Sequence, residues 1–216
     1  MDFAAARQNM VDCQILPNRV DDQRIINAMT EIPREMFAPS ELSAIAYVDE
    51  TLPLGDGRCV MEPMVIARLL QTAALKSGDV ALSIGCGSGY AVAVLAKIVD
   101  TVVAVETDKG LAQKATGNLS ELGLDNVAVV DGDLQQGNAE QGPYDVIFFD
   151  GSVSDVPSSI TDQLADGGRL VAIITSGGVG TAQLITRHGG ALSKQNIFDA
   201  GTSPLPGFEP EKSFAF

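Results

Sequence analysis

The sequence is poor in the residues that build metal centres and disulfide frameworks. Among 216 residues it has one histidine, His188, and three cysteines, Cys13, Cys59 and Cys86. The cysteines are far apart, odd in number and form no CxxC pair, so the spacing predicts no metal site. Three reduced thiols, and a start at Met1 that has no basic and apolar leader, predict a cytoplasmic protein.

Basic residues are scarce as well. Lys and Arg together number 14, whereas Asp and Glu number 28, and the formal net charge is −14. Because so negative a surface repels phosphate groups, the composition disfavours nucleic acids and anionic membranes as partners. No stretch reaches the roughly 18 consecutive apolar residues of a membrane span. Hydrophobic residues make up 45% of the chain, which is typical of a globular protein and leaves the oligomeric state open.

Hydrophobic periodicity divides the chain into two regions. Residues 1–60 have apolar residues at helical spacing that four prolines interrupt, and they are expected to form an N-terminal helical extension. Residues 61–216 are expected to form one compact α/β domain. Its predicted helices cover residues 63–75, 90–99 and 111–122, and its predicted strands cover 80–84, 101–105, 127–130, 146–149 and 170–174. This alternation predicts a mostly parallel, doubly wound sheet, and segments 183–187 and 191–198 around His188 predict a C-terminal β-hairpin.

A glycine loop connects the strand over residues 80–84 to the next helix. Gly85, Gly87 and Gly89 follow a G-x-G-x-G spacing. Glycine lets the backbone turn tightly and lets a ligand approach closely, and the start of the helix adds free N–H groups. The same loop is also compatible with a strand-to-helix turn that binds nothing, so a second feature is needed to assign a ligand.

Two acids that follow neighbouring strands supply that feature. Glu106 ends the strand over residues 101–105, where a carboxylate accepts both hydroxyls of a ribose. Asp133 follows the next strand, where it is either an acceptor for an adenine amino group or a solvated turn residue. The dinucleotide fingerprint has a small third residue where this chain has the bulky Tyr90. The pattern therefore disfavours a nicotinamide cofactor and resembles the first motif of Rossmann-like S-adenosyl-L-methionine (SAM)-dependent methyltransferases.

The order of several further segments resembles the protein-L-isoaspartate (D-aspartate) O-methyltransferase family. Its VPREKF, AYxDxPLPIG, GQTISQPYIVA and GTGSGY motifs correspond to residues 32–37, 46–55, 57–67 and 85–90. The resemblance implies a SAM-dependent enzyme that methylates the carboxylate of isoaspartyl residues in damaged proteins. A carboxylate is ionised at neutral pH and needs no general base, so positioning and a dry site carry such a reaction. The substrate is then a protein or peptide, with a small molecule as an open alternative.

The resemblance also implies which residues hold the cofactor. These are the residues of the signature segment, of the glycine loop and of the two acidic strand ends: Cys59, Val60, Met61, Ser83, Gly85, Cys86, Gly87, Glu106, Asp133 and Leu134.

The signature segment departs from the family at residues near the reacting carboxylate. Met61 replaces the family's serine, and a thioether donates no hydrogen bond. The alternative interpretation of Met61 is an apolar residue that covers the cofactor pocket. Glu62 replaces a glutamine, and Asp150 is a substrate-site carboxylate or a solvated strand-end residue. The catalytic residues therefore stay unassigned, and two alternatives remain: a methyltransferase with a changed substrate, and a non-catalytic cofactor-binding protein.

Overall fold

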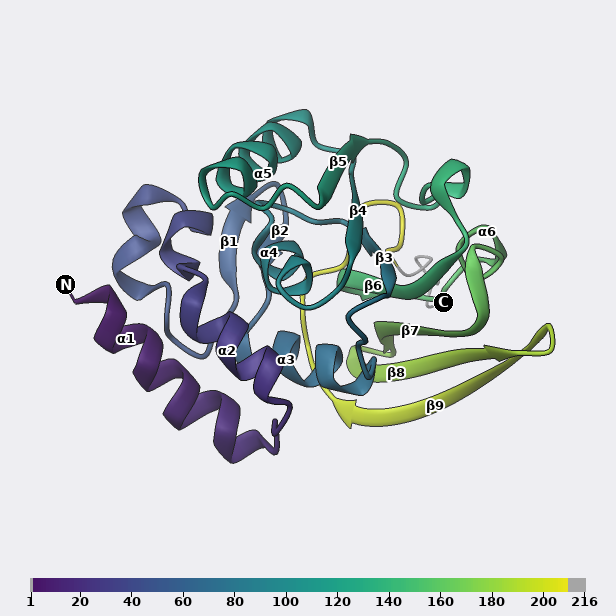
Figure 1. Ribbon diagram of the computed structural model, residues 1–216, viewed down its shortest axis with the longest axis horizontal. Helices are drawn as coiled ribbons and strands as arrows, with labels where there is room; N and C mark the ends of the chain where they lie inside the picture. The colour runs from purple at the N-terminus through teal and green to yellow at the C-terminus, as the bar shows by residue number, and fades with distance from the viewer. Residues whose placement is uncertain (1, 210–216) are drawn as a thin grey trace, which may run out of the picture.

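A computed structural model describes residues 2–209 of the chain. Its centre is a seven-stranded sheet with the strand order β5-β4-β3-β6-β7-β8-β9. The strands are β3 (Val80–Ile84), β4 (Thr101–Glu106), β5 (Val127–Asp131), β6 (Tyr144–Val153), β7 (Leu164–Ser176), β8 (Val179–His188) and β9 (Ala191–Asp199). The first five strands in this order are parallel, and β8 and β9 are antiparallel (Figure 1). The predicted Rossmann-like fold is confirmed.

Helices cover one face of the sheet far more thickly than the other. They are α1 (Phe3–Met10), α2 (Gln23–Glu31), α3 (Pro63–Thr72), α4 (Tyr90–Ala96), α5 (Lys109–Glu121) and α6 (Ser158–Thr161). Buried residues of α1 to α5 share one core cluster with alternate strand residues such as Ala81 and Ala104. The opposite face, with Leu82 and Ile84, packs against α6, loop residues and the chain after β9. Part of the second core is therefore supplied by segments without regular structure.

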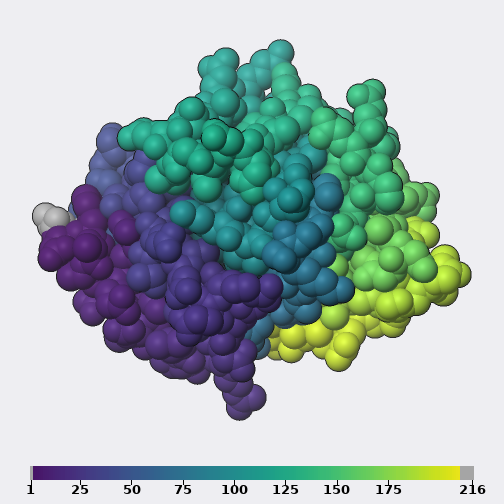
Figure 2. All heavy atoms as spheres, viewed as in Figure 1, coloured from purple at the N-terminus to yellow at the C-terminus, as the bar shows by residue number. Residues whose placement is uncertain are grey.

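The N-terminal region is more varied than its sequence pattern suggests. Short helical turns at Val11–Ile15, Leu16–Asn18, Arg34–Phe37 and Ser40–Ile45 lie among its helices. It also contains a small antiparallel hairpin of β1 (Leu52–Gly55) and β2 (Arg58–Val60), which the prolines in this stretch gave no reason to expect. Figure 2 shows the N-terminal region and the C-terminal hairpin at opposite ends of one face. The division of the chain at residue 60 remains a prediction.

The C-terminal hairpin is confirmed and is longer than expected. Gly189 and Gly190 join β8 to β9 with φ angles of 56° and 80°, which suits a tight turn with left-handed residues. A second glycine pair, Gly177 and Gly178, joins β7 to β8 in the same way, with φ angles of 60° and 83°. Within residues 2–209, no helix has the length and apolar character needed to cross a membrane.

A half-buried arginine binds several groups at the end of the sheet that lies away from the glycine loop. Arg169 on β7 donates to both carboxylate oxygens of Asp79, at 3.3 Å and 2.5 Å. It also donates to the carbonyl oxygens of Ala73, Ala74 and Asp145 at 2.9, 2.9 and 3.2 Å. The side chain of Asp79 is 5% exposed. Arg169 therefore ties the end of α3 to two parallel strands.

We expect Arg169→Ala to lower the free energy of unfolding by about 3–5 kcal/mol, because it leaves a buried carboxylate without its partner. Urea denaturation followed by circular dichroism measures the change. The control is Arg24→Ala, which breaks an ion pair with Asp22 whose arginine is 49% exposed. That loss should stay below about 1 kcal/mol. Equal losses in the two variants would contradict the role of Arg169.

Candidate functional site

The glycine loop lies between β3 and α4 with all three glycines in left-handed conformations. Gly85, Gly87 and Gly89 have φ angles of 76°, 55° and 98°. The strands β3 and β4 pair in register as far as Ile84 and Val105, so the next residue, Glu106, comes beside the loop. The Gly87 N–H donates to Glu106 Oε2 at 2.7 Å. The predicted proximity of the loop and the acid is thus present.

The carboxylate of Glu106 is fully engaged by the protein itself. Oε1 accepts from Arg58 Nη1 at 2.6 Å and from the N–H groups of Thr107 and Asp108 at 2.9 and 3.1 Å. Oε2 accepts from Arg58 Nη2 at 2.9 Å in addition to Gly87. The side chains of Arg58 and Glu106 are 5% and 0% exposed. A carboxylate offers about four lone-pair positions, so a ribose hydroxyl would have to displace a donor that is already present.

A leucine fills the space above the glycine loop. A Cβ atom placed on Gly85 would lie 2.5 Å from Leu205 Cδ2 and 3.3 Å from Arg58 Nη2. Arg58 Nη2 also donates to the Gly85 carbonyl oxygen at 2.8 Å. Leu205 is 1% exposed. The residue types suit an adenosyl ligand, and Leu205 packs closely against the first glycine of the loop.

Most of the predicted cofactor residues lie in the segments that meet at the glycine loop. Cys59, Val60, Met61, Ser83, Gly85, Cys86, Gly87 and Glu106 are all on β2, β3, β4 and the loops that follow them. The Ser83 hydroxyl is buried without a hydrogen-bond partner among residues 2–209. Met61 is 0% exposed, and its carbonyl oxygen accepts from Arg34 Nη2 at 2.8 Å. The Met61 side chain is therefore a core residue here.

The two residues predicted after β5 differ in their surroundings. Asp133 is exposed, and its Oδ1 accepts from the Gln135 N–H at 2.9 Å. Leu134 is buried in the same cluster as Leu205 and Phe208. Only Leu134 therefore contributes to the packed part of the candidate site.

Asp150 lies inside the protein, so its interpretation as a solvated strand-end residue is wrong. It belongs to β6 and is 6% exposed, and its Oδ1 has no hydrogen-bond partner among residues 2–209. Burial raises the pKa of Asp150 to about 7, while the charges of Arg58 and Arg34 lower it and that of Glu106 raises it. Asp150 is therefore an acid near its midpoint at neutral pH.

Glu62, in contrast, is partly exposed at the start of α3. Partial burial raises the pKa of Glu62, and the nearby carboxylates of Asp49 and Glu50 raise it further. Glu62, Asp49 and Glu50 therefore form a group of acidic side chains beside the signature segment.

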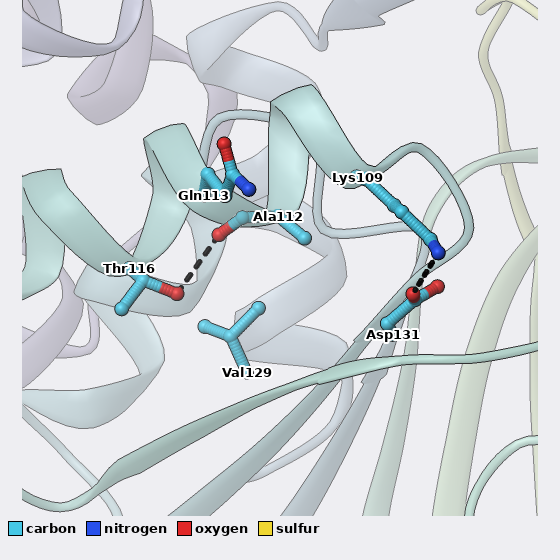
Figure 3. A pocket seen from close by; sticks show the side chains of 6 residues that line it. All are labelled: Lys109, Ala112, Gln113, Thr116, Val129 and Asp131. Carbon is cyan, nitrogen blue, oxygen red and sulfur yellow. Dashed lines mark hydrogen bonds and ion pairs between the residues drawn. The ribbon is translucent and has the colours of Figure 1, made fainter.

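Two surface grooves lie near the sheet edge, and they differ in their relation to the site. One of about 330 Å³ lies between α5 and β5, where Lys109 and Asp131 form an exposed ion pair at 3.5 Å (Figure 3). None of the predicted cofactor residues lines that groove. A second groove of about 290 Å³, between the β1–β2 hairpin and the start of α5, reaches Arg58. The second groove is thus connected to the glycine loop through Arg58, which donates to the Gly85 carbonyl oxygen.

The sequence profile described as "Protein-L-isoaspartate(D-aspartate) O-methyltransferase (PCMT)" matches residues 5–201. The chain belongs to this family. A relative from Koribacter versatilis named protein-L-isoaspartate O-methyltransferase is 35% identical over 205 residues, which cover 95% of this chain and 92% of the relative. The resemblance found in the sequence motifs is confirmed.

Two solved structures agree with this membership. One described as a protein-L-isoaspartate O-methyltransferase is 28% identical and gives a TM-score of 0.81, covering 93% of this chain and 66% of that chain. A Plasmodium falciparum structure is 24% identical, gives a TM-score of 0.79 and covers 95% of this chain and 98% of that chain. It shows that the fold is shared.

Two residues that contact the glycine loop or Glu106 were not predicted from the sequence. Arg58 stands where the family motif GQTISQPYIVA has its first glutamine, and this change was the available signal. Leu205 lies after the last segment that resembles the family, so no motif pointed to it. Within residues 2–209, no group of three His, Cys, Asp or Glu side chains is arranged to hold a metal ion.

We expect Asp150→Asn to stabilise the protein increasingly as the pH rises. The pKa of Asp150 is raised to about 7 in the folded state from 3.8. The native state therefore holds more protons than the unfolded state across this window, and wild-type stability falls with rising pH. The gain should be under about 1 kcal/mol near pH 4 and approach at most about 4 kcal/mol at pH 8.

Thermal denaturation at several pH values measures this difference. The matched control, Asp125→Asn, changes an exposed aspartate. A stability difference between Asp150→Asn and wild type that does not vary with pH would contradict the assignment.

Proposed function

We propose that the chain binds SAM and transfers its methyl group to the carboxylate of isoaspartyl residues in damaged proteins. The observation that carries this proposal is the position of Glu106 beside the glycine loop, across two strands paired in register, in a member of this family. The related P. falciparum protein is described as a complex with S-adenosyl-L-homocysteine. We further propose that the protein acts in the cytoplasm, where Cys13, Cys59 and Cys86 stay reduced.

We assign the cofactor to the residues around the glycine loop. Glu106 would hold the ribose and Asp133 the adenine, with the backbone of Gly85 and Gly87 in close approach. The remaining residues of the site would line the cofactor: Cys59, Val60, Met61, Ser83, Cys86 and Leu134. When bound, SAM supplies an electrophilic methyl group. The protein then has to orient an already ionised carboxylate and exclude water, which requires no histidine base.

A second candidate is favoured by the signature segment. Met61 offers no hydrogen bond to a substrate carboxylate, and Glu62 and Asp150 add acidity where the family has neutral residues. These features suit a cationic or hydroxyl-bearing acceptor better than an anionic one. The closed ion pair between Arg58 and Glu106 favours a third reading, in which the protein keeps the fold without catalysis.

One pair of measurements separates these readings. Calorimetric titration with SAM, S-adenosyl-L-homocysteine and NAD tests cofactor choice, and methyl transfer to an isoaspartyl peptide tests the reaction. Binding of either sulfur compound followed by transfer supports the proposed enzyme. Binding without transfer supports a changed substrate or a non-catalytic protein. No binding of either sulfur compound contradicts the proposed enzyme.

We expect Met61→Ser to raise the rate of methyl transfer to the isoaspartyl peptide. A hydroxyl that donates to a charged carboxylate contributes about 1.5–3 kcal/mol, which corresponds to roughly 10–100-fold in rate. The control is Met36→Ser, which makes the same change at a partly exposed methionine outside the signature segment. A rate unchanged by Met61→Ser, in a variant that circular dichroism shows to be folded, would contradict the role assigned to the lost serine.

A further inference from the structure

Asp150 lies at an irregular place near the end of β6. Phe148 of β6 pairs with Val171 of β7, and Ser152 pairs with Ile173, so three residues of β6 stand opposite one residue of β7. A bulge of this kind changes the direction of a side chain and is common beside active sites. Asp150 is the middle residue of the three, so it is set apart from the regular alternation of the strand.

The order of the strands places Asp150 at one end of the proposed cofactor site. In the sheet, β5, β4, β3 and β6 are consecutive neighbours. The proposed function assigns the adenine to Asp133 after β5 and the ribose to Glu106 at the end of β4. The rest of the cofactor, which carries the methyl group, would then extend past the glycine loop of β3 toward β6. Because Ile84 pairs with Phe149, Asp150 comes beside that loop on the β6 side.

The charged and titratable neighbours of Asp150 come from several elements. Burial, the largest effect, raises the pKa of Asp150 to about 7, while the charge of Arg58 lowers the pKa, that of Glu106 raises it and that of Arg34 lowers it. The charge of Asp150 in turn helps to raise the pKa of the Cys86 thiol in the glycine loop. About half of the molecules therefore carry a proton on Asp150 at neutral pH.

The Asp150 carboxyl group is free to make a further hydrogen bond. It is 6% exposed, and its Oδ1 has no partner among residues 2–209, which is unusual for a buried polar atom. Arg34, whose charge acts on Asp150, donates through Nη2 to the Met61 carbonyl oxygen at 2.8 Å. Arg34 thus connects Asp150 to the signature segment. The Met61 side chain has no donor, whereas a protonated carboxyl group has one.

We propose that the protonated Asp150 carboxyl group donates a hydrogen bond to the isoaspartyl carboxylate and so positions it for methylation. This inference rests on the proposed function, because it names the substrate contact of that same site. The substrate oxygen that accepts this hydrogen bond is the one that does not react. The other oxygen forms the bond to the methyl carbon, and the electron pair of the carbon–sulfur bond goes to sulfur, which becomes a neutral thioether. The proton stays on Asp150.

The proposal fixes the direction of the pH dependence. A like charge beside a carboxyl group disfavours its ionised form, so binding of the isoaspartyl carboxylate and protonation of Asp150 favour each other. With saturating SAM, kcat/KM of the wild type for an isoaspartyl peptide should fall from pH 6 to pH 9, approaching about tenfold for each pH unit at the upper end. If Asp150 were a base for a hydroxyl-bearing acceptor, the rate would rise with pH instead.

Two substitutions separate the hydrogen bond of Asp150 from its charge. Asp150→Asn keeps a donor and never ionises, so kcat/KM should match the wild type at pH 6 and should not fall toward pH 9. Asp150→Ala removes the donor and should lower kcat/KM about 10–100-fold at pH 6, mainly through a higher KM, because the bond is made to the charged substrate. The matched control, Asp125→Asn at an exposed aspartate, should keep the wild-type pH profile.

A binding measurement that needs no turnover gives a second test. The isoaspartyl peptide is titrated at pH 8 into the protein saturated with S-adenosyl-L-homocysteine, by calorimetry in two buffers of different ionisation enthalpy. The difference between the buffers gives the protons taken up on binding. The wild type and Asp125→Asn should take up most of one proton per peptide, and Asp150→Asn should take up none. A merely structural role of Asp150 would give no uptake in any of the three.

The outcomes separate this inference from the proposed function. Methyl transfer by the wild type, with a kcat/KM that does not fall with pH and with no proton uptake, would overturn the role of Asp150 and leave the proposed function standing. A kcat/KM that rises with pH and is lost in Asp150→Asn would overturn that role as well. Proton uptake that depends on Asp150, without methyl transfer, would support the contact and contradict the reaction. A folded wild type that neither binds nor methylates the peptide would overturn both.

Discussion

A guanidinium and a carboxylate meet almost without solvent where β2, β4 and the glycine loop converge. Removing one partner of such a buried pair typically destabilises a protein by about 3–5 kcal/mol, because the other charge is left uncompensated. Arg58 also holds the Gly85 carbonyl oxygen, and Glu106 also holds the Gly87 N–H. The pair therefore fixes the shape of the loop and at the same time occupies the carboxylate that the proposed function assigns to the ribose. One ion pair therefore determines both the conformation of the glycine loop and whether the Glu106 carboxylate is free to accept a further hydrogen bond.

Short sequence motifs predicted those parts of the site that depend on residues close together in the chain. The glycine spacing indicated a tight turn, which the structure makes with left-handed backbone at Gly85, Gly87 and Gly89, and the next strand placed Glu106 beside them. Arg58 could not be found in this way, because its partner is 48 residues further along the chain. Its identity as a donor depends on how β2 docks against the sheet. No periodicity in β2 carries that information.

The same distinction applies to the second face of the sheet. Short apolar and β-branched runs predicted strands within β3 to β7, but they did not say what would cover each face. Long helices cover one face, whereas the other depends on a four-residue helix and on Leu205 and Phe208. The segment after β9 contains Pro204 and Pro206, so it shows neither helical nor strand periodicity. For Asp150 the sequence left a substrate-site carboxylate and a solvated strand-end residue open, and only the packed structure shows that it is buried.

The thin cover of that second face has a thermodynamic consequence. Leu205 and Phe208 are almost completely enclosed, and they cover strand residues of the same cluster such as Leu82 and Ile84. Exposure of apolar surface to water raises the heat capacity. Loss of this segment from the sheet would therefore raise the heat capacity of the protein even while all seven strands stay paired.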